Sequence, residues 1–278
     1  MTLKTTSTLP TRDLTERIAT EVRADKAALL SGDHAGAIRA LLEQRGVLVF
    51  PQIGFTDAEQ IAFTETLGTL APERDGEAVY DVTLDTNVNK QADYLKGSFY
   101  WHLDGTMNQV PILASLLSSK VLPADGGGDT EFCNTYAAYD DLSDEDKAQI
   151  ASLRAMHSAW NSLLYYDPEP DFATLRQMMA IGERELPVVW THRSGRKSLI
   201  LGCTASNIVG MDYAQSTKTL VRLRDWATQP QFVYRHVWSV GDLVMWDNTG
   251  TMHRALPYDP NSGRMLRRTK LAGEEPFA

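Results

Sequence analysis

The sequence predicts a fold that is α+β and mainly β, with a β-sandwich or jelly-roll core and helices packed around it. Two observations support this prediction. Short strand-like segments separated by turn signals follow one another from Phe99 onward, whereas helical periodicity is concentrated near the N-terminus. The chain has 278 residues, of which 43% are hydrophobic and 23% charged, and no change in composition marks a linker. We therefore expect residues 1–278 to form one globular domain.

The N-terminal segment is expected to contain a tail, two helices and a strand. Residues 1–12 are rich in Thr and Ser and predict a loose tail. Residues 13–45 show helical periodicity with a break at Ser-Gly-Asp, where Asp33 is the expected N-cap of the second helix. The apolar run Val47–Phe50, stopped by a proline, predicts a buried strand.

The rest of the chain alternates between helices, loops and short strands. A helix is expected from Thr56 to about Leu67, and the polar residues 71–97 predict a long loop or lid. Further helices are expected at about 143–152 and 213–227. Strands are expected at Tyr100–Asp104, Ile112–Lys120, Thr130–Asn134, Val188–His192, Leu199–Gly202, Phe232–Trp238, Leu243–Asn248 and Met265–Leu271.

Charge and cysteine content exclude several classes of protein. Lys and Arg number 27 and Asp and Glu 36, which gives a net charge of −9. This acidity argues against binding to nucleic acid or to an anionic membrane, and no apolar run approaches the roughly 18–20 residues that span a bilayer. Cys133 and Cys203 are the only cysteines, which excludes a disulfide scaffold and an all-cysteine metal site. We expect a cytoplasmic protein.

Two histidines and one carboxylate form a candidate metal site. In a strand, residues i and i+2 point to the same face, so His102 and Asp104 would enter one cavity together. A third group, His253, follows a strand and a Thr-Gly-Thr turn far along the chain. Two histidines and one carboxylate on one face form the facial triad of non-haem Fe(II) oxygenases, which leaves coordination positions open for a co-substrate and oxygen.

The last expected strand carries several arginines. Alternation places Arg264, Leu266 and Arg268 on one face of that strand and Arg267 on the other. An inward arginine beside the His253 strand could bind a carboxylate through two parallel hydrogen bonds. Without the other motifs, this strand would be interpreted as a solvated edge strand.

The order and spacing of these motifs resemble a known family. The segments are Gly46–Phe50, Trp101–Asp104, Gly127-Gly128-Asp129-Thr130, Trp246-Asp247-Asn248, Met252–Ala255 and Arg264–Arg268. Together they resemble the taurine/chlorophenoxyacetate dioxygenase (TauD/TfdA) family of Fe(II)- and 2-oxoglutarate-dependent oxygenases. The resemblance extends over most of the chain, to Thr269.

The resemblance implies a double-stranded β-helix (jelly-roll) core with flanking helices. It implies that His102, Asp104 and His253 bind Fe(II), and that O2 and 2-oxoglutarate are the co-substrates. The implied reaction hydroxylates an aliphatic C–H and releases succinate and CO2. The carboxylate at Asp104 argues against the halogenating relatives, in which a small residue leaves room for halide.

Further residues are implied to bind the co-substrate. Arg268 matches the arginine that holds the distal carboxylate of 2-oxoglutarate, and Thr130 matches a hydroxyl that assists it. Arg264 matches a second basic position near that carboxylate. Arg267 should face away because of strand alternation.

The sequence says less about the identity of the substrate than about the metal and the co-substrate. Taurine is disfavoured because no histidine lies between His34 and the metal motif, and because Ser98 stands where an amide would help to bind sulfonate. The segments around Ser98, Tyr100 and Tyr165 are aromatic and apolar. If these residues line the pocket, the substrate is a larger hydrophobic or aromatic compound. The alternative is that the aromatic side chains belong to the core.

Two alternatives to simple hydroxylation remain open. The first is oxidative C–O or C–S cleavage of an aryloxyalkanoate, alkyl sulfate or sulfonate. The second is a jelly-roll protein that binds metal without oxygenase activity, such as a zinc hydrolase or a ligand sensor, for which Arg268 would have no purpose. The expected partner is a small-molecule substrate, and the family's habit of forming dimers or tetramers makes a homo-oligomer possible.

Overall fold

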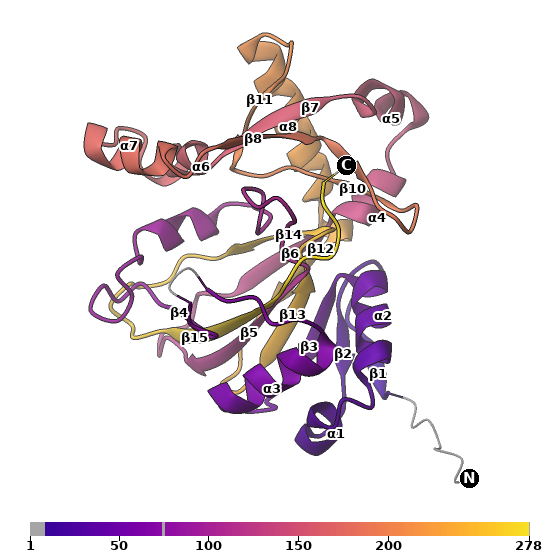
Figure 1. The fold of residues 1–278 in the computed structure, drawn as a ribbon, viewed down its shortest axis with the longest axis vertical. Coiled ribbons are helices and arrows are strands. Elements are labelled where there is room, and N and C mark those ends of the chain that lie inside the picture. The colour runs from indigo at the N-terminus through magenta and orange to yellow at the C-terminus, as the bar shows by residue number, and fades with distance from the viewer. Residues whose placement is uncertain (1–8, 74–75, 278) are drawn as a thin grey trace.

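The computed structural model describes residues 9–73 and 76–277 and is a mixed α/β structure (Figure 1). Its largest sheet has seven strands. Their order is β1 (Thr11–Asp13), β2 (Thr20–Val22), β3 (Val47–Phe50), β13 (Leu243–Asp247), β5 (Ala114–Val121), β15 (Met265–Leu271) and β4 (Tyr80–Val82). A three-stranded sheet contains, in order, β12 (Val233–His236), β6 (Thr130–Asn134) and β14 (Thr251–Ala255).

Alternation along β3 assigns the two faces of the large sheet. Leu48 and Phe50 pack in a cluster with apolar residues of helices α1 (Lys26–Leu30), α2 (Ala35–Arg45) and α3 (Asp57–Leu67). Val47 and Val49 point the other way and pack in a cluster with Phe132 of β6. The large sheet therefore carries helices on one face and the three-stranded sheet on the other.

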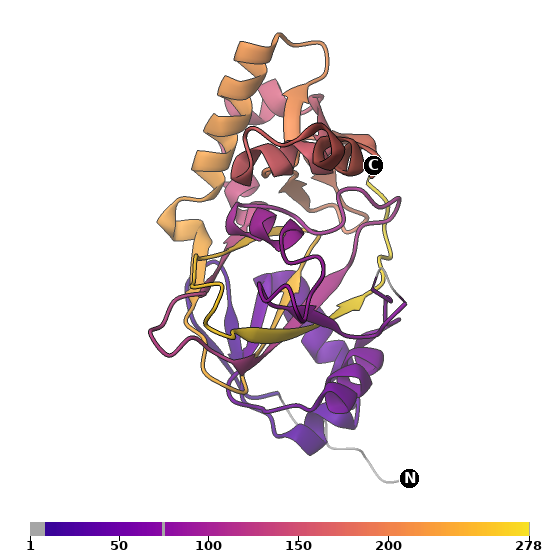
Figure 2. The same cartoon turned by 90° about the vertical axis from the view of Figure 1, so that its left-hand side faces the viewer.

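Most of the elements between β6 and β12 form the upper part of the molecule in Figure 1. Strands β7 (Arg154–Ser158), β8 (Glu183–Pro187) and β11 (Ala205–Ile208) form a third sheet, and β9 (Val189–Thr191) pairs with β10 (Lys197–Leu199). The helices here are α4 (Thr135–Asp140), α5 (Asp144–Ile150), α6 (Ala159–Tyr166), α7 (Phe172–Met179) and α8 (Tyr213–Ala227). Figure 2 shows the full length of α8, whose buried face includes Leu220 and Leu223. The 3-10 turn η2 (Pro230–Phe232) leads from α8 into β12.

Several expected elements are confirmed. Helix α3 begins where it was predicted, because Thr56 and Glu59 form a reciprocal capping box. Helix α8 matches its expected range, and α5 lies within the expected 143–152. The structure also contains β8, β11, α6 and α7, which the sequence did not predict.

Other expectations near the N-terminus are wrong. Residues 1–8 of the expected tail lie outside the described residues, but Thr11–Asp13 form β1 and pair with Thr20–Val22. The helical periodicity of residues 13–22 is overridden because β2 also pairs in parallel with β3. Helix α2 begins after His34, not Asp33, and His34 makes no side-chain capping hydrogen bond.

Two further segments differ from the prediction in ways that shape the site. Residues 100–104 do not run along a neighbouring strand; only His102 forms a bridge, with His253. The expected loop at 71–97 contains β4, which pairs with β15, and leads into the 3-10 helix η1 (Tyr94–Phe99). Among the described residues, no helix is long and apolar enough to span a membrane.

Candidate metal centre and cavity

The three predicted metal ligands lie together. His102 exchanges two backbone hydrogen bonds with His253, N–H to O=C, at 3.1 and 2.9 Å. Asp104 follows two residues later, and its carboxylate oxygens lie 3.8 Å from Nε2 of each histidine. One ligand atom from each of the three residues lies within 4.8 Å of the others. The bridge between two distant segments therefore brings the motif together.

Hydrogen bonds orient two of these ligands. Nδ1 of His102 lies 2.8 Å from the carbonyl of Tyr100, which can only accept, so Nδ1 donates and Nε2 keeps its lone pair for a metal. Ser115 donates to Asp104 at 3.1 Å, and Asn248 donates to Ser115 at 2.9 Å. This relay runs from Asn248, directly after β13, through Ser115 on the neighbouring strand β5, and fixes the carboxylate.

The electrostatics favour the ligand-competent protonation states. Burial alone would raise the pKa of Asp104, but His253, Arg268 and His102 outweigh it and lower this pKa to about 2. Burial lowers the pKa of His253 to about 3. At neutral pH Asp104 is therefore ionised and His253 neutral, the forms that bind a metal.

The donor set fits a divalent iron ion. Two imidazole nitrogens and one carboxylate converge, and the part of the chain that the structure describes contains no cysteine in the group. Nitrogen and oxygen donors with an open side suit non-haem iron better than structural zinc, which prefers closed tetrahedral sites. His102, Asp104 and His253 are thus the residues that would hold the metal.

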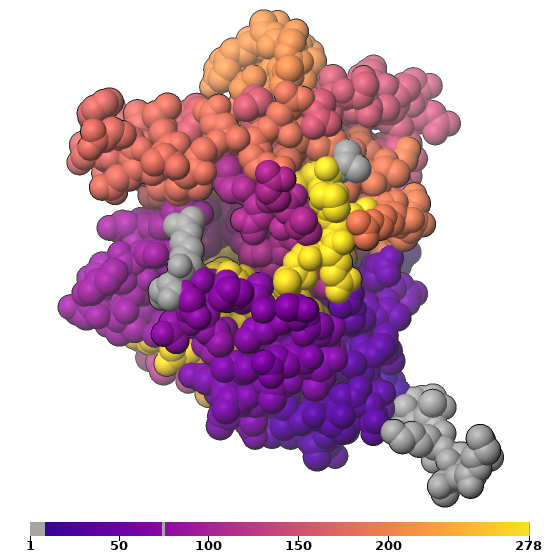
Figure 3. Space-filling model, viewed as in Figure 1, coloured from indigo at the N-terminus to yellow at the C-terminus, as the bar shows by residue number. Residues whose placement is uncertain are grey.

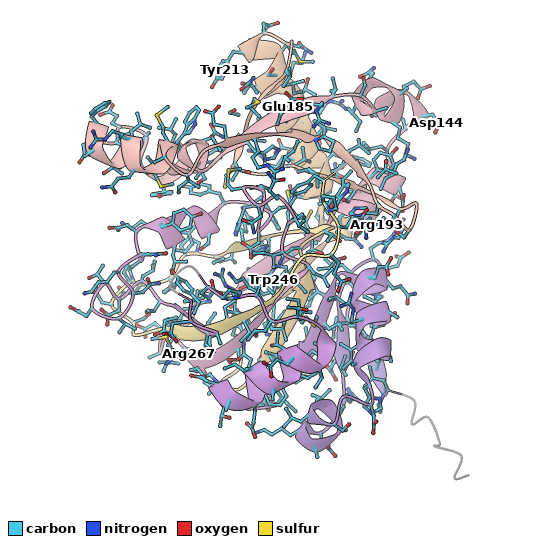
Figure 4. All side chains as sticks on the ribbon, viewed as in Figure 1. Asp144, Glu185, Arg193, Tyr213, Trp246 and Arg267 are labelled. Carbon is cyan, nitrogen blue, oxygen red and sulfur yellow. The ribbon has the colours of Figure 1, made fainter. Side chains whose placement is uncertain are left out.

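A cavity of about 410 Å³ opens directly over the three ligands. Apolar side chains line much of it, including Leu95, Phe99 and Ile112. Trp246 lies in the middle of the molecule in Figure 4 and packs against the His253 ring, with centroids 4.7 Å apart. In Figure 3 the surface is hollowed beneath the segment that carries α6 and α7. The cavity is large enough for a co-substrate and a small organic molecule.

Arg264 lines this cavity, and one of its N–H groups lacks a hydrogen-bond partner among the described residues. It is 2% exposed, its Nη2 donates to the carbonyl of Gly128 at 2.7 Å, and its guanidinium stacks on Tyr258 at 4.5 Å. Its Nε is buried and has no hydrogen-bond partner among the described residues. A guanidinium that lines the cavity and keeps one N–H unsatisfied is a candidate partner for a carboxylate oxygen.

Thr130 lines the same cavity. Its Oγ1 accepts a hydrogen bond from Nε1 of Trp238 at 3.1 Å. Because the indole can only donate, the threonine hydroxyl keeps its own hydrogen for another acceptor. Thr130 is therefore set up to donate into the cavity.

Arg268 has a different environment from Arg264. Its Nε and Nη2 donate to the carboxylate of Glu73 at 3.2 and 3.0 Å, and its guanidinium lies 5.0 Å from the Tyr80 ring centroid. Lys270 also contacts Glu73, at 2.8 Å. Sequence reasoning missed Glu73 and Lys270, because nothing in their spacing relates a loop glutamate to the end of a distant strand.

The face of the last strand agrees with the predicted alternation. Arg264, Leu266 and Arg268 all line the cavity. Arg267 points away, forming ion pairs with Asp57 and Asp81, and Figure 4 places it on the outer side of β15.

Of the three residues predicted to contact substrate, one lines the cavity and two do not. Ser98 lines the cavity. Tyr100 and Tyr165 instead stack on each other, with ring centroids 5.1 Å apart, and are not among the described residues that line it. Their predicted contact with substrate stays a prediction.

Comparison with known proteins identifies the family. The model of the family described as "Taurine catabolism dioxygenase TauD, TfdA family" matches residues 10–270. The chain belongs to the TauD/TfdA family. An alpha-ketoglutarate-dependent 2,4-dichlorophenoxyacetate dioxygenase of Burkholderia sp. (strain RASC) is 39% identical over 251 residues, covering 84% of this chain and 83% of the relative. An alpha-ketoglutarate-dependent sulfate ester dioxygenase of Pseudomonas putida is 33% identical, covering 94% and 88%.

Solved structures of TauD/TfdA-like proteins share the fold. The crystal structure of AAD-2 with Mn(II) and N-oxalylglycine has a TM-score of 0.84 and 34% identity, covering 98% of this chain and 100% of the other. A taurine dioxygenase from Burkholderia xenovorans has a TM-score of 0.78 and 26% identity, covering 97% and 93%. This chain is therefore an Fe(II)- and 2-oxoglutarate-dependent dioxygenase that hydroxylates an aliphatic C–H of a small organic substrate, with O2 as the oxidant.

Proposed function

We propose that this dioxygenase oxidises a small acid with an apolar or aromatic body, such as an aryloxyalkanoate. The observation that carries the proposal is a cationic pair, Arg268 and Lys270, in the same apolar-walled cavity as the metal ligands. The charge of Arg268 acts on Asp104, which sets the acid-binding group close to the reactive centre. Relatives that are named as 2,4-dichlorophenoxyacetate and phenoxypropionate dioxygenases support the same substrate class.

In this proposal the two cavity arginines have separate roles. The family resemblance assigns the distal carboxylate of 2-oxoglutarate to Arg268, with Arg264 as a second group. The contacts favour the reverse assignment, because Arg264 has the buried unpaired donor while Arg268 is already engaged by Glu73. Arg264 and Thr130 would then hold 2-oxoglutarate, and Arg268 would attract the acid group of the substrate.

The chain's residues make the chemistry selective. When bound by the triad, iron with 2-oxoglutarate and O2 supplies the oxidising power, with release of succinate and CO2. Thr130 and Arg264 neutralise and orient the co-substrate, while the apolar walls exclude water and leave little freedom for the substrate body. If the hydroxylated carbon carries an ether oxygen, the product collapses and the C–O bond breaks. Cleavage is then a consequence of hydroxylation.

A sulfate ester is the second candidate substrate. A sulfate group carries the same single negative charge as a carboxylate and could use the same cations, and a sulfate ester dioxygenase is among the relatives. For both candidates, the proposed core is the double-stranded β-helix (jelly roll) of the family, formed by the two facing sheets of one domain over residues 1–278.

The proposal also includes the cellular location, the partners and the oligomeric state. We expect a cytoplasmic enzyme that acts on small molecules without nucleic acid or membrane, in line with two buried, unpaired cysteines, Cys133 and Cys203. A homodimer or homotetramer is expected because members of the family often form such oligomers.

An anaerobic titration tests the proposed function. Fe(II) followed by 2-oxoglutarate should produce the weak visible charge-transfer band of the chelate, and phenoxyacetate should perturb it. On exposure to O2, phenoxyacetate should be consumed with release of phenol and succinate. Asp104→Ala should abolish band and turnover. A band with no response to phenoxyacetate or to an alkyl sulfate would refute the substrate class while leaving the cofactor assignment intact.

A further inference from the structure

One member of the ion cluster in the cavity, Glu73, has no role in the reaction described above. Glu73 is 6% exposed, and its carboxylate accepts from Arg268 Nε and Nη2 at 3.2 and 3.0 Å and contacts Lys270 Nζ at 2.8 Å. All three residues line the cavity that contains the metal ligands. Burying an ionised carboxylate costs free energy unless it is paired with opposite charges, and Glu73 is paired with two cations.

The cluster is assembled from two separate elements. Arg268 and Lys270 lie two positions apart on β15, so alternation directs both side chains to the cavity face. Glu73 comes from the loop before β4. Strand β15 therefore supplies two positive charges, and the loop cancels one of them.

The formal charges define what the substrate site can accept. Within the cluster, Arg268 and Lys270 contribute two positive charges and Glu73 one negative charge, which leaves one net positive charge. Asp104 also acts on Arg268, but its charge is the same with and without the Glu73 carboxylate and so does not enter the difference that Glu73 makes. Arg264 lies apart from this cluster, against Gly128 and Tyr258. A single net positive charge complements a monoanion and leaves the second charge of a dianion uncompensated in a buried site.

We propose that Glu73 is a specificity-determining residue that lowers the positive charge of the Arg268–Lys270 site by one, so that the enzyme selects monoanionic acids and rejects dianions. This inference rests on the proposed function, because it assigns the acid group of the substrate to that site. Glu73 does not react and need not touch the substrate; it acts through the charge of the site.

A purely structural role for Glu73 would have a different signature. It could pin its loop to β15, but that loop has other attachments. Ala71 N–H donates to the Lys270 carbonyl at 2.9 Å, and β4 pairs with β15 at three positions, Tyr80, Asp81 and Val82. These backbone contacts do not depend on the Glu73 carboxylate, so Glu73→Gln, which keeps the size and hydrogen-bonding ability of the side chain, should fold.

The expected effect depends on the charge of the ligand. A unit charge about 6 Å away, at an effective dielectric constant of about 20–40, alters the affinity of a monoanion by roughly tenfold to a hundredfold. The energy doubles for a dianion, so its affinity changes by the square of that factor. A neutral ligand of the same shape should not respond. The logarithm of the affinity change should therefore increase in proportion to ligand charge.

Glu73→Gln in the anaerobic Fe(II)–2-oxoglutarate enzyme tests this proportionality. The probes are phenyl methanesulfonate, phenyl sulfate and phenyl phosphate at pH 8, which carry charges of zero, one and two on similar tetrahedral groups, together with phenoxyacetate. Binding is measured by calorimetry and by perturbation of the visible band. The control is Glu274→Gln, because Glu274 also forms a bidentate pair with an arginine, Arg39 at 2.7 Å, but is not among the described residues lining the cavity.

The expected result is at least tenfold tighter binding of phenyl sulfate and phenoxyacetate by Glu73→Gln. Phenyl phosphate should gain by the square of that factor, and the neutral ester should not change. Glu274→Gln should leave all four affinities unaltered. Equal shifts for all probes, no shift, or weaker binding of the anions would each overturn the inference.

Failure of the inference and failure of the proposed function can be told apart. If wild-type enzyme oxidises phenoxyacetate but Glu73→Gln shows no charge-dependent change, the proposed function stands and the role of Glu73 is refuted. If the charge dependence is found but phenoxyacetate and sulfates are not oxidised, Glu73 tunes the site and the proposed substrates are wrong. Binding of no probe by either protein overturns both.

Discussion

Gly128 offers a direct test of whether Arg264 anchors 2-oxoglutarate. At Gly128 φ is +72°, and an added Cβ would lie 2.5 Å from Arg264 Nε and 2.9 Å from its Cδ. Contacts this short are not tolerated, so Gly128→Ala must move the arginine side chain. The same atom, Nε, is the buried donor that we assign to the distal carboxylate of 2-oxoglutarate.

The magnitude follows from the two effects of the substitution. A non-glycine residue at positive φ costs about 1–2 kcal/mol in stability. Displacement of the guanidinium removes a charge-assisted hydrogen bond to the co-substrate, which contributes about 1.5–3 kcal/mol. Since about 1.4 kcal/mol corresponds to a factor of ten, the Kd for 2-oxoglutarate should rise roughly 10- to 100-fold.

Gly126→Ala is the matched control. Gly126 lies in the same turn at a φ of +80°, but nothing lies within 4 Å of an added Cβ. Both variants should lose similar stability in chemical denaturation, and only Gly128→Ala should lose affinity for 2-oxoglutarate in the anaerobic band titration. Fe(II) affinity should be unchanged in both. If Gly128→Ala binds 2-oxoglutarate as tightly as Gly126→Ala, Arg264 is not the anchor.

Three further predictions address the cavity and the core. Trp238→Phe removes the donor that directs the Thr130 hydroxyl, so affinity for 2-oxoglutarate in calorimetry should fall about fivefold. Trp226→Phe, which loses an indole hydrogen bond to a backbone carbonyl outside the cavity lining, should retain wild-type affinity. Arg268→Ala should raise the KM for phenoxyacetate at least tenfold while the Kd for 2-oxoglutarate stays within about twofold; the opposite pattern would restore the family-based assignment. Burial lowers the pKa of His157 to about 4 from 6.5. The unfolded state then binds more protons as pH falls, so up to about 3 kcal/mol of stability present above pH 6.5 should be lost by pH 4. His157→Gln should flatten that part of the stability profile, and an unchanged slope would contradict the assignment.

The metal site was predictable in part because two of its three ligands lie close together in the sequence. His102 and Asp104 are two positions apart and need only an extended backbone to share a face. The pattern alone offered His253 as a third ligand, but only the order of the motifs in the family resemblance supported placing it beside His102, since no local rule brings the two histidines together. The structure shows that the connection is a single backbone bridge, although the sequence predicted a full strand at residues 100–104.

Elements whose pattern depends on tertiary pairing were not predictable. Residues 13–22 have helical periodicity, yet β2 is extended because it pairs with β1 on one side and β3 on the other. Strand β4 carries Asp81 in a polar segment and is a strand only because the edge of β15 is available to it. Burial and pairing with distant residues outweigh local propensity at such edges.

The two cavity arginines show where sequence reasoning ends and geometry becomes necessary. Arg264 and Arg268 share residue type, strand face and cavity, so alternation gives no basis for assigning different ligands to them. What separates them is the surrounding structure: Arg264 lies against Gly128 and Tyr258 with Nε unpaired, whereas Arg268 is held by Glu73. An unpaired N–H can form a full-strength hydrogen bond to the carboxylate of a ligand. An N–H that already donates to a protein carboxylate must share its charge between that group and the ligand. The division of labour between co-substrate and substrate is therefore determined by their neighbours, and the loop that supplies Glu73 has no counterpart in any motif of the sequence.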